Sequence, residues 1–159
     1  MTHEINGIRQ YLKVTDSFMK GAGQSGTMQG FVLKHGRNFK PQRTPDKYID
    51  LRGEIKECFK NSAMAACLCR DLIYCEGYAC GFIPVMHAWC VTLDGRLVEL
   101  TWRDIGTEYF GIPFKSEFLR RKLLESKYYG LIDDWHNNWP LVRGKHPKSE
   151  WFKKLKGKL

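Results

Sequence analysis

Two apolar runs joined by a turn signal decide the fold: VMHAWCVTL, residues 85–93, and RLVELTW, residues 96–102. Both runs are short and rich in β-branched or aromatic residues, which is typical of buried strands. The Asp94-Gly95 pair between them is the strongest short hairpin signal in the chain. A further apolar run, Ile73–Cys80, precedes them and predicts one more strand. The sequence therefore predicts three antiparallel strands.

Helices are predicted on both sides of these strands. The stretch Cys58–Leu72 is alanine-rich and free of glycine and proline, so it predicts a largely buried helix. Residues Ser116–Ser126 predict a charged helix, Leu131–Trp139 a short one, and Ile8–Phe18 an amphipathic helix or strand. A helix, three strands and further helices in this order indicate an α+β domain with a helix packed on a small antiparallel sheet.

Length and composition are those of a single globular domain. The 159 residues can bury one sizeable core, and 43% hydrophobic with 27% charged residues is an ordinary globular composition. This excludes a disordered chain, a collagen-like fibre and a coiled coil. We divide the chain into a basic N-terminal segment (1–57), a core that carries the candidate chemistry (58–114), a helical segment (115–142) and a basic tail (143–159).

The same features favour a cytoplasmic protein without membrane contact. The longest stretch free of formal charge, Gly77–Leu93, contains Pro84 and His87, so no membrane helix is expected there. The first residues show no basic start followed by an apolar run, which argues against a secretory signal. Six cysteines without an export signal favour the reducing cytosol, where they remain thiols.

Neither a metal nor an organic cofactor is expected. All six cysteines fall within residues 58–90, but no C-x-x-C motif exists and the closest pair would point to different sides of a helix. Residues Lys20–Gly30 contain a G-x-G-x-x-G pattern. A dinucleotide loop must follow a strand and open a helix, whereas Thr27–Leu33 has the pattern of a loop followed by a strand. This segment is therefore predicted to be a flexible loop.

Cys58, His87 and Glu99 carry the candidate chemistry. Cys58 lies where the predicted buried helix begins, and the free N–H groups at a helix start stabilise a thiolate. His87, inside an apolar strand, could accept the thiol proton and later hand it to a leaving group. Glu99 is a lone acid in the next strand, and a buried carboxylate is costly without a partner. Orienting the His87 ring would give it that partner.

The hairpin loop decides whether His87 and Glu99 share a face of the sheet. A two-residue loop would put Glu99 on the face away from His87. A three-residue loop, with Gly95 left-handed as a bulge, puts Trp89 opposite Glu99 and leaves Glu99 diagonal to His87 on one face. The triad therefore predicts the three-residue loop.

These motifs resemble the transglutaminase-like branch of the papain-like cysteine fold. That branch often has His-Ala-Trp on one strand and Asp-Pro-Thr after the next turn, where this chain has His87-Ala88-Trp89 and Glu99-Leu100-Thr101. The stretch 58–114 is also similar to small bacterial and bacteriophage proteins of unassigned function. The shared motifs are a helix start, a strand and an aromatic loop, here Cys58-Phe59-Lys60-Asn61, Glu76-Gly77-Tyr78-Ala79 and Tyr109-Phe110-Gly111-Ile112-Pro113-Phe114.

The resemblance implies a papain-like or transglutaminase-like core and acyl chemistry through a thiolate. The reaction would be proteolysis, deamidation or transfer of an acyl group to an amine. The substrate would be a protein or a small molecule with an amide, peptide or thioester bond. The protein would act in the host cytoplasm if a bacteriophage encodes it. Cys58 would be the nucleophile, His87 the general base and acid, and Glu99 the residue that orients His87.

Other residues are candidates for support of this site. Four of them could hydrogen-bond near it or wall a groove: Asn61, Glu76, Trp89 and Tyr109. An oxyanion would need hydrogen-bond donors. The first candidate donor is the backbone N–H of Cys58, and a second could come from a glutamine upstream of it: Gln24, Gln29 or Gln42.

The charge distribution supports other functions. The formal net charge of +9 divides into +4 for residues 1–57, −1 for 58–142 and +6 for 143–159. Basic flanks either contact nucleic acid or another polyanion, or form a solvated face. One alternative is thus a non-catalytic binding module for nucleic acid or a host protein, and another is an inactive protein that keeps the fold and holds a partner. In the binding module the tail lysines would matter: Lys145, Lys148, Lys153, Lys154, Lys156 and Lys158.

Overall fold

The computed structural model describes residues 7–156. The first half contains α1 (Gly7–Gly21), α2 (Met28–His35), β1 (Arg37–Phe39), the 3-10 helix η1 (Asp46–Leu51), α3 (Cys58–Leu68) and β2 (Leu72–Cys80). The second half contains β3 (Pro84–Thr92), β4 (Leu97–Val98), β5 (Glu108–Pro113), α4 (Ser116–Ser126), the 3-10 helix η2 (Trp135–Asn137) and α5 (Lys148–Trp151). The α+β class predicted from the sequence is confirmed. Lys158, one of the tail lysines considered above, lies outside the described residues.

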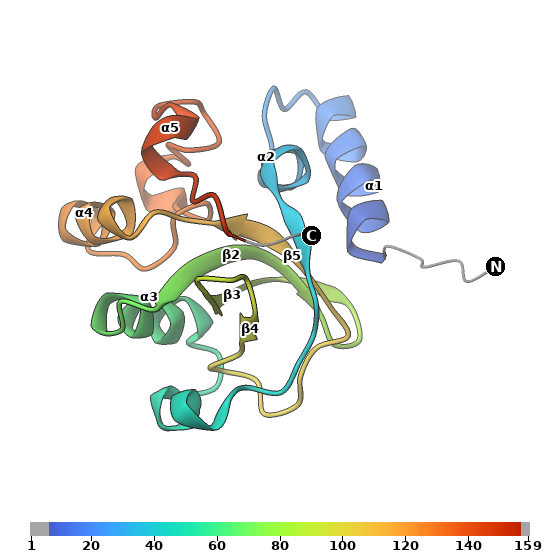
Figure 1. The fold of residues 1–159 in the computed structure, drawn as a ribbon. Helices are drawn as coiled ribbons and strands as arrows, with labels where there is room; N and C mark the ends of the chain where they lie inside the picture. The colour runs from blue at the N-terminus through green and yellow to red at the C-terminus, as the bar shows by residue number, and fades with distance from the viewer. Residues whose placement is uncertain (1–6, 157–159) are drawn as a thin grey trace.

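The five strands form one antiparallel sheet in the order β1-β5-β2-β3-β4, and the sheet curls into a half-barrel (Figure 1). Two glycines allow the backbones of β2 and β5 to approach each other closely within the sheet. Gly77 pairs with Gly111, and a Cβ on Gly77 would lie 2.4 Å from the Cα of Gly111. A Cβ on Gly111 would in turn lie 2.7 Å from the indole of Trp89. The missing side chains therefore make room for Trp89 inside the half-barrel.

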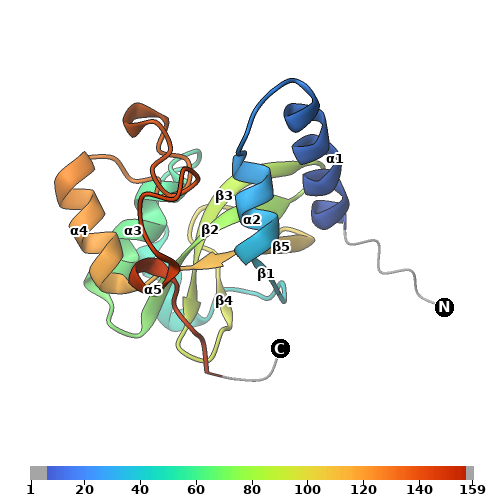
Figure 2. The same ribbon diagram turned by 90° about the horizontal axis from the view of Figure 1, so that it is seen from above.

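Each face of the sheet has its own apolar core. The helices pack on the outer face, where α1 and α2 cover one part and α3 and α4 another (Figures 1 and 2). A smaller cluster fills the inner face of the curl: Phe39, Ile73, Cys75, Ala79, Trp89, Val91, Leu97 and Tyr109. Trp102 and Ile105, from the loop between β4 and β5, pack against this inner cluster. Among residues 7–156, no helix is long and apolar enough to cross a membrane.

The β3–β4 hairpin has the three-residue loop that the triad predicts. Val91 pairs with Leu97 and Cys90 with Val98, so the loop consists of residues 93–95. Gly95 lies at φ +85°, in the left-handed region that glycine adopts most readily. This register puts the side chains of His87 and Glu99 on the same side of the hairpin.

The third predicted strand is wrong in its length. Residues 96–102 were expected to be extended, but β4 ends at Val98. The chain turns there because the carboxylate of Glu99 accepts hydrogen bonds from the backbone N–H groups of Thr101, at 2.9 Å, and Trp102, at 3.2 Å. These N–H groups are thereby withdrawn from the sheet.

One further strand and one helix differ from the expectation. The predicted loop at residues 109–114 is largely strand β5, which lies between β1 and β2 and is buried from Tyr109 onward. The loop was expected from the resemblance, but these residues pair with β2, and the close packing against Gly77 requires the glycine at 111. Residues from Met28 form helix α2 and not a strand, because Thr27 caps the helix by accepting a hydrogen bond from the N–H of Gly30 at 2.8 Å.

Two predicted helices are shorter than expected. Helix α3 ends at Leu68, and the last residue of the predicted helix, Leu72, already begins β2. The predicted helix at residues 131–139 is reduced to η2. Its first backbone N–H groups, at residues 131–133, bind the carboxylate of Glu76 and are directed toward the sheet. The predictions for residues 116–126 and 8–18 agree with α4 and α1.

Candidate active site

Cys58 is the first residue of α3. Hydrogen bonds from the first turn of this helix hold it to the segment before it and to the region that carries Glu99. Asn61, in the first turn, donates from Nδ2 to the carbonyl of Glu54 at 2.9 Å and to Oγ1 of Thr101 at 3.0 Å. No side chain caps the helix start, so the N–H groups of the first turn remain without intrahelical partners. These groups are available to a negative charge at the helix start.

His87 and Glu99 form the centre of the site. His87 Nε2 lies 2.8 Å from Oε2 of Glu99, and both side chains are almost completely buried. A carboxylate oxygen accepts, so the Nε2 nitrogen donates, and Nδ1 is the ring nitrogen that is not bound to Glu99. Because β4 pairs only with Cys90 and Val91, it leaves the edge of β3 open beside His87. Helix α3 packs against β3, and Cys58 at its start interacts with the His87 ring.

Glu99 is held by four hydrogen bonds. Besides His87, the hydroxyl of Tyr109 donates to Oε2 at 2.8 Å, and two backbone N–H groups donate to Oε1. The carboxylate is thus fully buried but fully paired, as a buried charge must be. Burial by itself would raise the pKa of Glu99, but the hydrogen bond from His87 and its other partners lower it below the ordinary value.

The same contacts set the protonation of His87. Burial alone would lower its pKa, whereas the interactions with Cys58 and Glu99 raise it to about 9. This raised pKa favours a cationic ring at neutral pH, and the ring interacts with both the Glu99 carboxylate and Cys58. The indole of Trp102 stacks on it with ring centroids 4.1 Å apart. Such an arrangement favours a positive ring and shields it from water.

Trp102 contacts both His87 and Glu99, although it was not among the site residues predicted from the sequence. Its backbone N–H binds Glu99 and its ring covers His87. One sequence signal was available: Trp102 follows Glu99 by three residues, within reach of a single turn. The expected extended strand would have placed it farther away.

The four supporting candidates fall in different places. Tyr109 contacts the site directly through its hydrogen bond to Glu99, whereas Asn61 is linked to it through Thr101. Trp89 is fully buried in the inner cluster and packs edge-on against Tyr109, with ring centroids 5.2 Å apart, so it walls no open groove. Glu76 pairs with Ala88, the neighbour of His87, and therefore lies on the opposite face of the sheet. The structure does not bring Glu76 to the site.

The glutamines considered as oxyanion donors are also dispersed. Gln42 donates from Nε2 to the carbonyl of Leu97 at 3.2 Å. Gln24 and Gln29 line a cavity of about 900 Å³ between the α1–α2 loop and residues 138–143. The first-turn N–H groups of α3 are therefore the donors that the structure places next to Cys58.

No protein-family model, no curated protein and no solved structure matches the chain. The six cysteines are free. Among residues 7–156, no group of three or more His, Cys, Asp and Glu side chains is placed to hold a metal ion. The chemistry of the site must therefore be inferred from its own geometry.

Removing the Tyr109 hydroxyl tests how tightly Glu99 is held. In Tyr109→Phe the carboxylate loses one donor and the N–H of Gly106, which binds the hydroxyl at 3.0 Å, loses its acceptor. We expect the free energy of unfolding in urea to fall by about 1–3 kcal/mol. Tyr11→Phe, at a side chain 36% exposed, is the control and should change it by less than about 0.5 kcal/mol. Equal effects of the two substitutions would contradict the role given to Tyr109.

Proposed function

We propose that the protein is a cysteine-dependent hydrolase or acyltransferase with Cys58 as nucleophile, His87 as general base and acid, and Glu99 as the orienting carboxylate. The observation that carries this proposal is the placement of His87. One ring nitrogen binds a buried carboxylate at 2.8 Å, and the ring also interacts with a cysteine at a helix start. A cysteine and an imidazole that interact, with a third group orienting the imidazole, are the elements of nucleophilic catalysis.

The proposed reaction follows from these positions. The Cys58 thiolate attacks the carbonyl carbon of an amide, peptide or thioester, and the carbonyl oxygen becomes negative near the first-turn N–H groups of α3. The C–N or C–S bond then breaks, and the leaving group takes the proton from the His87 imidazolium. Water or an amine attacks the resulting acyl-Cys58, gives its proton to His87, and releases the thiolate. Throughout, Glu99 keeps the His87 ring in position.

The helix-start cysteine facing an antiparallel sheet supports the finer fold assignment as well. A helix that begins at the cysteine, a strand with His87 and a following turn with Glu99 match the order of the papain-like and transglutaminase-like proteins that the motifs resemble. The burial of the triad supports an intact site, since the side chains of Cys58, His87 and Glu99 are all buried.

An activated ester tests the proposal directly. We expect p-nitrophenyl acetate to acetylate Cys58, with a burst of p-nitrophenolate equal to the enzyme concentration and a peptide that gains one acetyl group. Cys58→Ser should lose the burst, whereas Cys67→Ser and Cys69→Ser, at partly exposed cysteines, should keep it. Acetylation spread evenly over the cysteines, or a burst that survives in Cys58→Ser, would refute the assignment of the nucleophile.

A further inference from the structure

The net charge of the chain resides in two segments that lie far apart in the sequence. Residues 28–45 hold four Lys and Arg and no acid, and residues 143–156 hold six with one acid, Glu150. The other sixteen basic residues of the chain are balanced by sixteen acidic ones. The single acid is itself paired, because Glu150 lies 2.9 Å from Arg121 and 3.3 Å from His146. Together the two segments therefore account for the whole formal charge of +9.

The fold places the two segments side by side. Trp151 of α5 packs against Phe31 and His35 of α2, with ring centroids 5.3 and 5.1 Å apart. Besides burial, the charges of Lys148 and Lys34 lower the pKa of His35, so both lysines lie near that ring. The tail then follows the sheet, since the N–H of residue 153 donates to the carbonyl of residue 113 at 3.0 Å.

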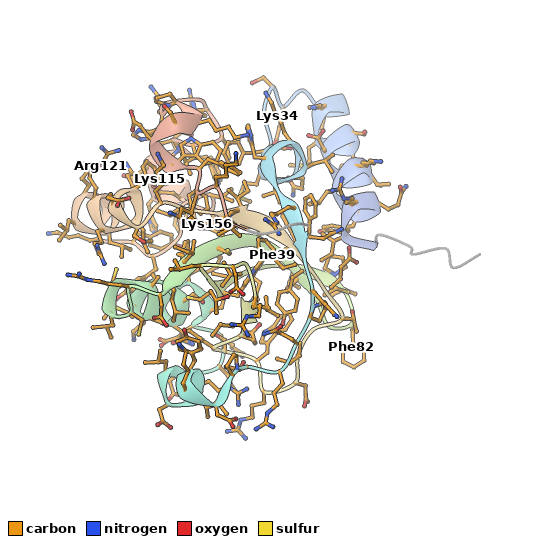
Figure 3. The ribbon with its side chains drawn as sticks, viewed as in Figure 1. Lys34, Phe39, Phe82, Lys115, Arg121 and Lys156 are labelled. Carbon is orange, nitrogen blue, oxygen red and sulfur yellow. The ribbon has the colours of Figure 1, made fainter. Side chains whose placement is uncertain are left out.

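The basic surface formed by the two segments reaches the first residue of β1, Arg37. A Cβ on Gly95 would lie 3.6 Å from Leu155 and 3.8 Å from the guanidinium of Arg37, so the tail and β1 meet at the β3–β4 loop. Figure 3 shows Lys34 on α2, with Lys115 and Lys156 along the α5 side of the molecule. We call this surface the basic strip: Lys34, Arg37, Lys115, Lys148, Lys153, Lys154 and Lys156.

The chemistry of the basic strip identifies its partner. None of the large hydrophobic side chains exposed among residues 7–156 belongs to the two segments. Such groups form the apolar core of a protein interface and anchor an amphipathic helix in a membrane surface. A phosphodiester backbone requires only a row of cations. We infer that the basic strip binds the phosphate backbone of nucleic acid without reading its sequence, independently of the reaction proposed for Cys58.

The test is binding of a fluorescently labelled DNA duplex of mixed sequence, measured by anisotropy between 50 and 200 mM salt. With about five phosphate contacts, the logarithm of the binding constant should fall with the logarithm of salt concentration at a slope of about −4 to −5. A second duplex of unrelated sequence should bind equally. The same titration with duplex RNA and with a single-stranded nucleic acid identifies which form binds most tightly.

A charge-matched pair of variants separates the basic strip from net charge. Lys34→Glu with Lys156→Glu reverses two exposed lysines of the strip and should weaken binding at least about 30-fold and flatten the slope by about 2. Lys13→Glu with Arg70→Glu reverses two exposed cations outside it and should weaken binding less than about 3-fold. Equal weakening by the two pairs would overturn the proposal. So would absence of binding at 50 mM salt, or binding of poly-glutamate as tight as that of DNA.

Discussion

Replacing His87 by alanine is expected to slow the alkylation of Cys58 by iodoacetamide about 100-fold at pH 6, where only a small fraction of an ordinary thiol is ionised. In the native protein the His87 imidazolium faces Cys58 and is held by Glu99 at 2.8 Å, so a thiolate there has a cation beside it. The variant removes that cation but leaves the helix start unchanged. Peptide mass spectrometry gives the rate at each cysteine, and Cys67 and Cys69 serve as references within the same molecule.

The pH profile adds a second readout. Since interactions with Cys58 and Glu99 raise the pKa of His87 to about 9 against the lowering by burial, the ring remains cationic through neutral pH. Ester or amide turnover, which needs the imidazolium as an acid, should thus stay level to about pH 8 and decline as pH rises through 9. If Cys58 in the native protein alkylates no faster than the references below pH 8.5, the catalytic pair does not exist.

The second large effect is expected on the opposite face of the sheet. Glu76 is fully buried, and its carboxylate accepts hydrogen bonds from Leu131, Ile132 and Asp133 N–H groups and from the Tyr74 hydroxyl, at 2.7–2.9 Å. Glu76→Gln would turn an NH₂ group toward these donors. We expect the free energy of unfolding to fall by about 2–3 kcal/mol at pH 7.5, against less than about 0.5 kcal/mol for the exposed control Glu125→Gln.

The loss from Glu76→Gln should depend on pH in a defined direction. Burial raises the pKa of Glu76 to about 7, against the lowering by its hydrogen bonds. The folded protein therefore holds the proton more tightly than the unfolded chain, whose ordinary glutamate has a pKa near 4.3. This contribution to stability is largest at low pH and is lost as pH rises from about 4.5 through 7. The difference in the free energy of unfolding between the native protein and Glu76→Gln should be larger at pH 5 than at pH 7.5. A difference that increases with pH would contradict this prediction.

The sequence predicted those parts of the fold whose signals are local. The hairpin register followed from the Asp94-Gly95 turn and from the demand that His87 and Glu99 share a face, and the pairing of Cys90 with Val98 agrees with it. Helix α4 followed from its charged pattern, and α1 was one of the two forms weighed for residues 8–18. In each case residues adjacent in sequence decide the structure.

The parts that escaped prediction depend on distant partners. Strand β5 contains a glycine and a proline, and its place beside Gly77 explains the glycine, Gly111. The segment 131–133 has an apolar pattern suited to a helix, but the carboxylate of Glu76, more than fifty residues away, takes its N–H groups. Glu76 pairs with Ala88, the neighbour of His87, and side chains of neighbouring residues in a strand point to opposite faces. Glu76 and His87 therefore lie on opposite faces of the sheet, and the order of the strands determines this pairing.

The place of β5 in the sheet has a consequence for how the chain is made. Strand β1 pairs only with β5, through Arg37 with Gly111, Asn38 with Phe110 and Phe39 with Tyr109. A ribosome releases β1 long before β5, so α1, α2 and β1 wait without their sheet while the hairpin with His87 and Glu99 can already close. The segments before the hairpin therefore join the sheet only after β5 has been made, although they leave the ribosome first.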